Sequence, residues 1–274
     1  MASWHEATIN DMKQSLIDDD SVRGLVVIGS CARSDATPDA WSDLDVAVIV
    51  EDRSIDRFYP ATDWTAEFGE PYAHSLSRTQ HFCVVRAEYA DGRRVDFVII
   101  PESSLESIDH WVRNPLQFEN RCLFSRSPLL DGALTRAYPP RVIQPFPAEQ
   151  LEQMANDFCF KGMLAVSKAA RNELLVALHL ALHLSRDCLV LAMLIRDRAT
   201  GTDHHTDGSH GNDFLEMLAL PCKGYTSSDI LNSIEGSAVA FDALAARLDA
   251  DYHDRRAPLL DYMEHVRSVL RQTE

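Results

Sequence analysis

The sequence predicts an α+β protein with two parts, an N-terminal unit built on a mixed sheet with flanking helices (residues 1–145) and a C-terminal α-helical bundle (residues 146–274). Three observations lead to this prediction. Short apolar runs rich in β-branched residues lie within the first 100 residues. Residues 138–147 contain four prolines in ten positions, a density that ends regular structure. Residues 148–198 are almost free of glycine and proline and carry Leu, Ala and Met at helical spacing.

The first unit is expected to contain both helices and strands in alternation. Hydrophobic periodicity predicts an amphipathic helix, two buried strands, a second helix, two further strands joined by an Asp91-Gly92 hairpin turn, and short helices. In that order, the elements span residues 4–19, 23–28, 44–50, 54–68, 81–90, 94–100 and 102–113.

The second unit is expected to be entirely helical. The helical spacing that begins at residue 148 continues to 198 and returns over 229–248 and 256–272. The chain has no internal repeat and no low-complexity tract.

Composition narrows the class of partner. The chain of 274 residues has a formal net charge of −16 and an isoelectric point near 5.0. Such a surface repels nucleic-acid backbones and attracts cationic small molecules, although acidic surfaces also serve solubility alone. We therefore expect a small-molecule partner and no nucleic acid.

Location is predicted from what the sequence lacks. We expect no apolar run of membrane-spanning length, and the first residues lack the basic and apolar regions of a secretory signal. Six scattered cysteines without a Cys-x-x-Cys pair fit reduced thiols. The expectation is a cytoplasmic protein that does not enter a membrane.

Two carboxylates stand at the start of an apolar run. In a strand, Asp43 and Asp45 point to the same side, about 6–7 Å apart. They repel each other unless a cation lies between them, and Mg²⁺ is the cation that typically takes one or two carboxylates together with phosphate oxygens. Asp96 also opens an apolar strand and is the third candidate ligand.

A small-residue turn follows the first predicted strand. Gly29 permits a sharp turn and a close approach to a ligand. A helix beginning at Ser30 would present free N–H groups to an anion, and Arg33 would pair with a phosphate. Alone, such a turn or an Asp-x-Asp pair is usually structural, but together they match the needs of a metal-bound nucleoside triphosphate. The sequence contains neither a Walker loop nor a Rossmann fingerprint.

The arrangement of these motifs resembles a known superfamily. Gly29-Ser30, Asp43-Leu44-Asp45 and Asp96 resemble the nucleotidyltransferases that include DNA polymerase beta. The whole layout resembles the bacterial aminoglycoside 6-adenylyltransferases, which modify streptomycin. That likeness is carried by Trp41-Ser42-Asp43-Leu44-Asp45, by the Asp91-Gly92 hairpin leading to Val95-Asp96, and by Arg171-Asn172-Glu173-Leu174. Lincosamide nucleotidyltransferases share the layout.

The resemblance implies a reaction. AMP would pass from ATP to a hydroxyl of an aminoglycoside, and pyrophosphate would leave. Asp43 and Asp45 would hold two Mg²⁺ ions, while Asp96 would join one ion and orient the acceptor hydroxyl. The β- and γ-phosphates would be held by Gly29, Ser30 and Arg33.

The resemblance also implies roles in the second part of the chain. Glu173 would act as general base or bind an amino group of the acceptor; the alternative is an ordinary exposed glutamate on a helix. Lys168 would meet the triphosphate, with Lys161 as the other candidate. The histidines at 204, 205 and 210 favour a polar loop over a zinc site.

Two other functions stay open at this point. One is transfer to a lincosamide or to an unrelated metabolite, and the other is a nucleotide-binding module without turnover. The sequence alone leaves open the acceptor, the hydroxyl modified, the nucleotide, and the choice between monomer and homodimer.

Overall fold

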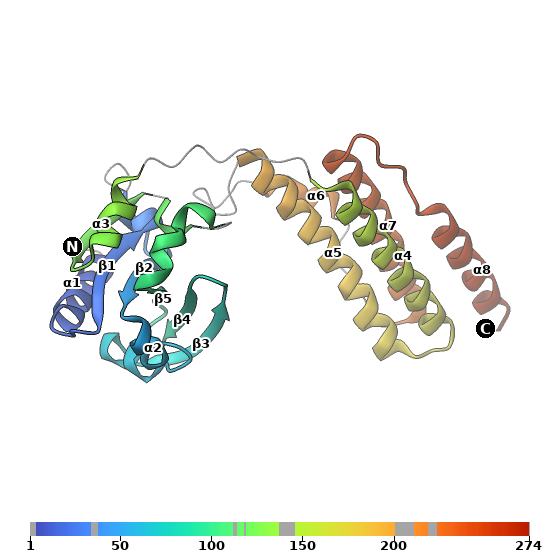
Figure 1. The fold of residues 1–274 in the computed structure, drawn as a ribbon. Helices are drawn as coiled ribbons and strands as arrows, with labels where there is room; N and C mark the ends of the chain where they lie inside the picture. The colour runs from blue at the N-terminus through green and yellow to red at the C-terminus, as the bar shows by residue number, and fades with distance from the viewer. Residues whose placement is uncertain are drawn as a thin grey trace. The chain divides into compact units, whose positions relative to one another are not determined.

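A computed structural model describes residues 4–33, 38–111, 114–117, 119–136, 146–200, 211–218 and 224–273. The chain divides into two compact units, Met1–Pro139 and Pro140–Glu274. Both units are drawn in Figure 1. The predicted boundary at residue 145 and the histidines at 204, 205 and 210 lie outside the described residues.

The first unit is built on a mixed six-stranded sheet, which confirms the predicted fold class. The strand order is β3-β4-β5-β2-β1-β6. Only the central pair β2 and β5 is parallel; the other neighbours are antiparallel. In chain order the strands are Val22–Ile28, Leu44–Val50, Pro71–Arg78, Cys83–Tyr89, Arg94–Pro101 and Asn120–Ser125.

Both faces of the sheet bury apolar side chains. On one face, α1 (Trp4–Ile17) and α2 (Ile55–Phe58) pack against alternate residues of the central strands. On the other face, a 3-10 segment (Glu102–His110) and α3 (Pro128–Thr135) pack against the remaining residues. Burial on both faces explains why the central strands are continuous apolar runs in the sequence.

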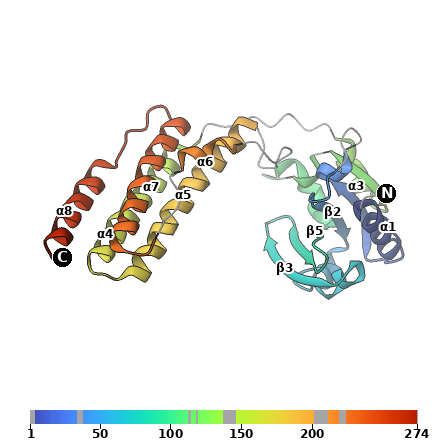
Figure 2. The same cartoon turned by 180° about the vertical axis from the view of Figure 1, so that it is seen from behind.

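The two edge strands, β3 and β6, are not among the strands predicted from the sequence. β3 is exposed along nearly its whole length, and β6 is only partly buried. β3 lies at a free edge of the sheet in Figure 2. A strand that buries little has no reason to be apolar, so neither segment carries the pattern by which strands are recognised.

The predicted helix over 54–68 is wrong. The chain forms the short α2, then breaks, then forms a 3-10 segment over Asp63–Phe68. The break follows from Pro60, which lacks an N–H and disfavours helical angles in the residue before it. Tyr59 is accordingly extended, with φ −158° and ψ 127°.

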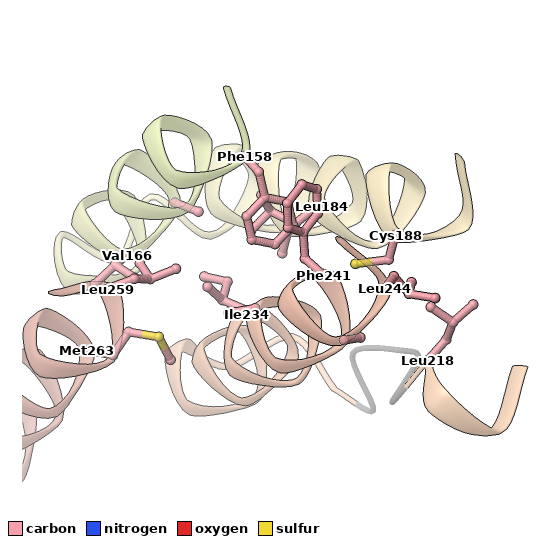
Figure 3. Close-up of a cluster of buried hydrophobic side chains, with 14 of the residues drawn as sticks. Phe158, Val166, Leu184, Cys188, Leu218, Ile234, Phe241, Leu244, Leu259 and Met263 are labelled. Atoms are coloured by element: carbon pink, nitrogen blue, oxygen red, sulfur yellow. The ribbon is translucent and has the colours of Figure 1, made fainter. Parts of the chain in front are cut away.

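The second unit consists of helices, as predicted. Its core is filled by side chains from all five described helices. Figure 3 shows Phe158 of α4 stacked on Phe241 of α7, with ring centroids 4.1 Å apart. The helices are α4 (Ala148–Ala170), α5 (Leu174–Thr200), α6 (Phe214–Met217), α7 (Ser227–Leu248) and α8 (Ala257–Thr273).

The predicted helical stretch 148–198 is divided into α4 and α5 by a short connection. Asn172 adopts a left-handed conformation there, with φ 58°. Asparagine tolerates this conformation better than most residues, so the chain can reverse without a glycine.

The helix α5 corrects one expectation from the sequence. Residues Leu174–Ala199 form one helix that is long and apolar enough to cross a membrane by length and composition. Its buried residues, among them Leu184 and Cys188, belong to the core that it shares with α4 and α7. About a third of its most apolar window, 33%, is buried. Core helices of proteins outside membranes meet the same test, so this finding is weak evidence for a membrane span.

Candidate active site

The strands β2 and β5 bring the predicted acidic residues to one end of the sheet, where β1 also ends. Asp45 is opposite Asp96 in the parallel pairing of β2 and β5, and it is also opposite Ile28, the last residue of β1. Asp45 shares its face with the alternate residues Ala47 and Ile49, which are buried in the core under α3. Burial of the apolar residues that follow therefore fixes the direction of the carboxylate.

The carboxylates form a cluster. Asp43, Asp45 and Asp96 each offer an oxygen, and these oxygens lie within 4.8 Å of one another. Asp96 is buried, whereas Asp43 and Asp45 are half-buried. Among the described residues, these three aspartates form the group of acidic, histidine or cysteine side chains whose ligand atoms lie close enough together to hold a metal ion.

Two arginines neutralise part of this charge. Arg94 lies 2.7 Å from Asp43 through Nη2 and 2.9 Å from Asp96 through Nε. Arg86 donates from Nε to the second oxygen of Asp96 at 3.0 Å. Arg86 comes from β4, where it is directly opposite Asp96.

Asp45 is the carboxylate that these arginines leave unpaired, within the residues that the structure describes. Its burial, together with the nearby negative charges of Asp43 and Asp96, raises its pKa to about 7. Arg94 and Arg86 oppose this rise from a distance. A half-buried carboxylate with two acidic neighbours is a strong site for an added cation.

The turn after β1 packs against Asp45. Gly29 has φ +69°, and a β-carbon placed there would lie 3.1 Å from the Oδ2 atom of Asp45. Any other residue would meet both backbone strain and the carboxylate. The turn is a four-residue 3-10 segment, Gly29–Ala32, rather than the start of the longer helix considered from the sequence.

Groups around the turn have partners already. The Gly29 N–H donates to the carbonyl of Glu119 at 3.1 Å, so this amide is not free for a ligand. The Cys31 thiol contacts the Asp43 carbonyl, with sulfur and oxygen 3.4 Å apart. Arg33 forms an ion pair with the exposed carboxylate of Glu119 at 3.2 Å. Ser30 is half-buried within the same turn.

The segment before β2 is anchored to α1. Nε2 of the buried His5 lies 2.9 Å from the Ser42 carbonyl, and since a carbonyl only accepts, this nitrogen carries the proton. The His5 ring stacks on Trp4 at a centroid distance of 3.8 Å. Asp39 accepts hydrogen bonds from the Trp41 N–H and the Ser42 hydroxyl. These contacts fix the backbone on which Asp43 stands.

Comparison with known proteins identifies the family. The sequence profile described as streptomycin adenylyltransferase matches residues 6–217. The chain belongs to this family. It is a nucleotidyltransferase of the aminoglycoside adenylyltransferase type, which confirms the resemblance found in the sequence. A search of curated proteins gives no match.

Solved structures similar to this family member include two adenyltransferases. One is an aminoglycoside 6-adenyltransferase from Bacillus subtilis, 14% identical, with 97% of this chain and 99% of that chain covered and a TM-score of 0.38. The other is a spectinomycin adenyltransferase from Enterococcus faecialis, solved with ATP and spectinomycin. It is 14% identical, with 89% and 98% covered and a TM-score of 0.33.

The remaining predicted residues of this family member belong to the second unit. Lys168 and Glu173 form an ion pair of 2.6 Å between the end of α4 and the connection to α5. Glu173 stands just before α5 rather than within a helix. Lys161 pairs with Asp187 of α5. The structure therefore groups the predicted residues into two sets, one in each unit.

Three residues of the enzyme's first unit were missed by sequence reasoning. Arg94 had a usable signal, because it lies two positions before Asp96 and so shares its face of the strand. Arg86 and His5 had none, since their contacts depend on the register of β4 and on where α1 packs.

Proposed function

We propose that the enzyme transfers AMP from ATP to a hydroxyl of a streptomycin-like aminoglycoside in a Mg²⁺-dependent reaction that releases pyrophosphate. One observation carries the proposal: oxygens of Asp43, Asp45 and Asp96 converge within 4.8 Å beside a turn that approaches Asp45 closely. The family assignment supplies the reaction class.

The donor set suits magnesium. All three groups are carboxylates, which are the hard oxygen ligands that Mg²⁺ prefers, and none is a soft sulfur ligand. We propose that Asp43 and Asp45 hold two Mg²⁺ ions and that Asp96 joins one of them. Bound Mg²⁺ neutralises phosphate charge and favours displacement at the α-phosphorus.

The protein's own contribution is position and charge. The Asp96 carboxylate orients the acceptor hydroxyl and receives its proton as the new bond forms. The turn holds the β- and γ-phosphates. Because the Gly29 amide is already bonded, Gly29 contributes close approach, whereas Ser30 and Arg33 contribute polar contacts.

In the second unit we assign Lys168 to the triphosphate and Glu173 to the acceptor. Glu173 is a half-exposed carboxylate next to Lys168, with side-chain exposures of 39% and 26%. Such a carboxylate can receive an ammonium group of the acceptor or accept a proton from it. Lys161 is the weaker candidate for the triphosphate, because it is held by Asp187.

The acceptor we propose is cationic, because the chain carries a net charge of −16. The same charge disfavours a nucleic-acid acceptor. We further propose a cytoplasmic location, as expected from the cysteine usage, and a monomer or homodimer.

Pyrophosphate release tests this proposal. The protein would be incubated with ATP and Mg²⁺ against streptomycin, spectinomycin, other aminoglycosides and lincosamides, with and without a chelator. We expect release that depends on metal and on an aminoglycoside. Release with lincosamides alone would reassign the acceptor. Tight ATP binding without release for any acceptor would favour a binding module.

A further inference from the structure

We propose that Arg94 occupies the place of the divalent cation in the metal-free enzyme, so that metal binding must displace its guanidinium from Asp43 and Asp96. This inference rests on the metal site of the proposed function. It adds a residue outside the predicted ligand set that controls when the site can be loaded.

The geometry of Arg94 is that of a bridging cation. Its Nη2 atom lies 2.7 Å from Oδ2 of Asp43 and 3.1 Å from Oδ2 of Asp96. Its Nε atom lies 2.9 Å from Oδ1 of Asp96. One guanidinium therefore joins two of the three carboxylates, across the interval that a shared metal ion would have to span.

A metal ion and the Arg94 guanidinium compete for the carboxylate oxygens of Asp96. A carboxylate offers about four acceptor positions. Asp96 already uses three of them, two for Arg94 and one for Arg86. One position remains, on Oδ1, and a metal ion bound there would lie directly beside the Arg94 guanidinium. Because both carry positive charge at this short distance, they repel each other, and the metal ion binds well only when Arg94 has moved away.

Arg86 has a different place. It reaches Asp96 alone, through Nε at 3.0 Å, and its Nη1 atom donates to Ser77 of β3 at 3.3 Å. It has no contact with Asp43 among the described residues. Arg86 lies on the β4 side of Asp96, so it can stay when a metal ion arrives and hold the carboxylate in place.

Once its contacts with the carboxylates break, the Arg94 side chain has room to move, whereas the Asp96 side chain has not. The Arg94 side chain is 43% exposed and the Asp96 side chain 9% exposed. Arg94 also begins β5, so its side chain can swing into solvent without disturbing the buried strand. Once displaced by the metal ion, the Arg94 guanidinium lies next to the proposed triphosphate site and can pair with a phosphate. The binding of metal and the binding of nucleotide therefore favour each other.

The test is Mn²⁺ binding without nucleotide, measured by the loss of the free-ion signal in electron paramagnetic resonance. We compare wild type with Arg94→Met, Arg86→Met and Arg53→Met. Arg53 is a surface residue paired with Glu51 and gives the same change in net charge. We expect Arg94→Met to bind Mn²⁺ about tenfold more tightly or better. Arg86→Met should gain clearly less, and Arg53→Met should match wild type.

Three results would overturn the inference. The first is an Arg94→Met variant that binds Mn²⁺ no more tightly than wild type, which would mean that Arg94 remains in place beside the metal. The second is an Arg86→Met variant that gains as much affinity as Arg94→Met, which would mean that only local charge matters. If no variant binds Mn²⁺ even with ATP, the metal site itself fails, and the proposed function fails with it.

A second variant covers the case in which Arg94→Met does not fold without metal. Arg94→Lys keeps a positive charge but has a single nitrogen and cannot bridge two carboxylates in the same way. Its Mn²⁺ affinity should lie between those of wild type and the expected value for Arg94→Met. An affinity equal to or below that of wild type would contradict the inference.

Discussion

Asp45 and Asp96 are opposite each other across the parallel strands β2 and β5, and the two arginines of the site pair with Asp96 but not with Asp45. The negative charge of Asp96 is therefore balanced by two arginines, whereas the charge of Asp45 has no such partner among the described residues. We infer that Asp45 is the carboxylate whose function depends most on an added cation.

Asp45→Asn tests this difference by removing one charge without a change of shape. We expect transfer of AMP to fall by about a thousandfold or more, because a metal ligand is lost. The metal-free fold should persist and its melting temperature should rise, since a half-buried charge that repels Asp43 and Asp96 is gone. Steady-state kinetics and thermal melts measure the two effects. Near-normal turnover would contradict the metal assignment.

The pH dependence of stability follows from the pKa of Asp45. In the folded, metal-free protein this pKa is raised to about 7 from an ordinary value of 3.8, so the folded state binds the proton more tightly than the unfolded state. Stability from this group is present at low pH, falls as the pH rises from about 4 to 7, and is then constant.

Melting curves of wild type and Asp45→Asn at several pH values, all without metal, isolate this effect. We expect wild type to lose about 5 °C relative to the variant between pH 5 and pH 8. Adding Mg²⁺ should reduce the loss. Parallel curves for the two proteins would show that Asp45 does not titrate in this range.

Gly29→Ala tests the close approach of the turn to Asp45, with Gly92→Ala as the matched control. Both glycines have positive φ, but a β-carbon at Gly92 meets nothing within 4 Å. Each substitution should cost about 1–2 kcal/mol of stability from backbone strain. Only Gly29→Ala should also weaken ATP binding and transfer. Equal activity in the two variants would remove Gly29 from the site.

Glu173→Gln separates the two roles proposed for this residue. If Glu173 binds an ammonium group, KM for a cationic acceptor should rise while kcat changes little. If it acts as a base, kcat should fall and its pH profile should change. Loss of the Lys168 ion pair alone should cost less than about 1 kcal/mol, because both side chains are partly exposed. Unchanged kinetics would leave Glu173 a surface residue.

The central part of the fold was predictable from the sequence because the strands buried there are also continuous apolar runs in the sequence. The strands that carry Asp45 and Asp96 are buried on both faces, and their apolar runs are unmistakable. The edge strands β3 and β6 carry no such pattern, and their pairing is decided by neighbours far along the chain. Pro60 divided a predicted helix, although its effect is local and readable from the sequence.

The acidic cluster was predictable for the same reason, whereas its surroundings were not. Alternation along a strand gave the direction of Asp45, and the shared pattern suggested Asp96 as a neighbour. The counter-charge from Arg86 and the anchor from His5 depend on register and on helix packing, which no local pattern encodes. The break at Asn172, which places Glu173 before α5, depends on one left-handed residue.

Anomalous diffraction from crystals grown with Mn²⁺ and a non-hydrolysable ATP analogue tests the central claim most directly. We predict Mn²⁺ coordinated by oxygens of Asp43, Asp45 and Asp96, with the guanidinium of Arg94 moved away from Asp43. Mn²⁺ bound elsewhere, or absent from these carboxylates while the nucleotide is bound, would contradict the account.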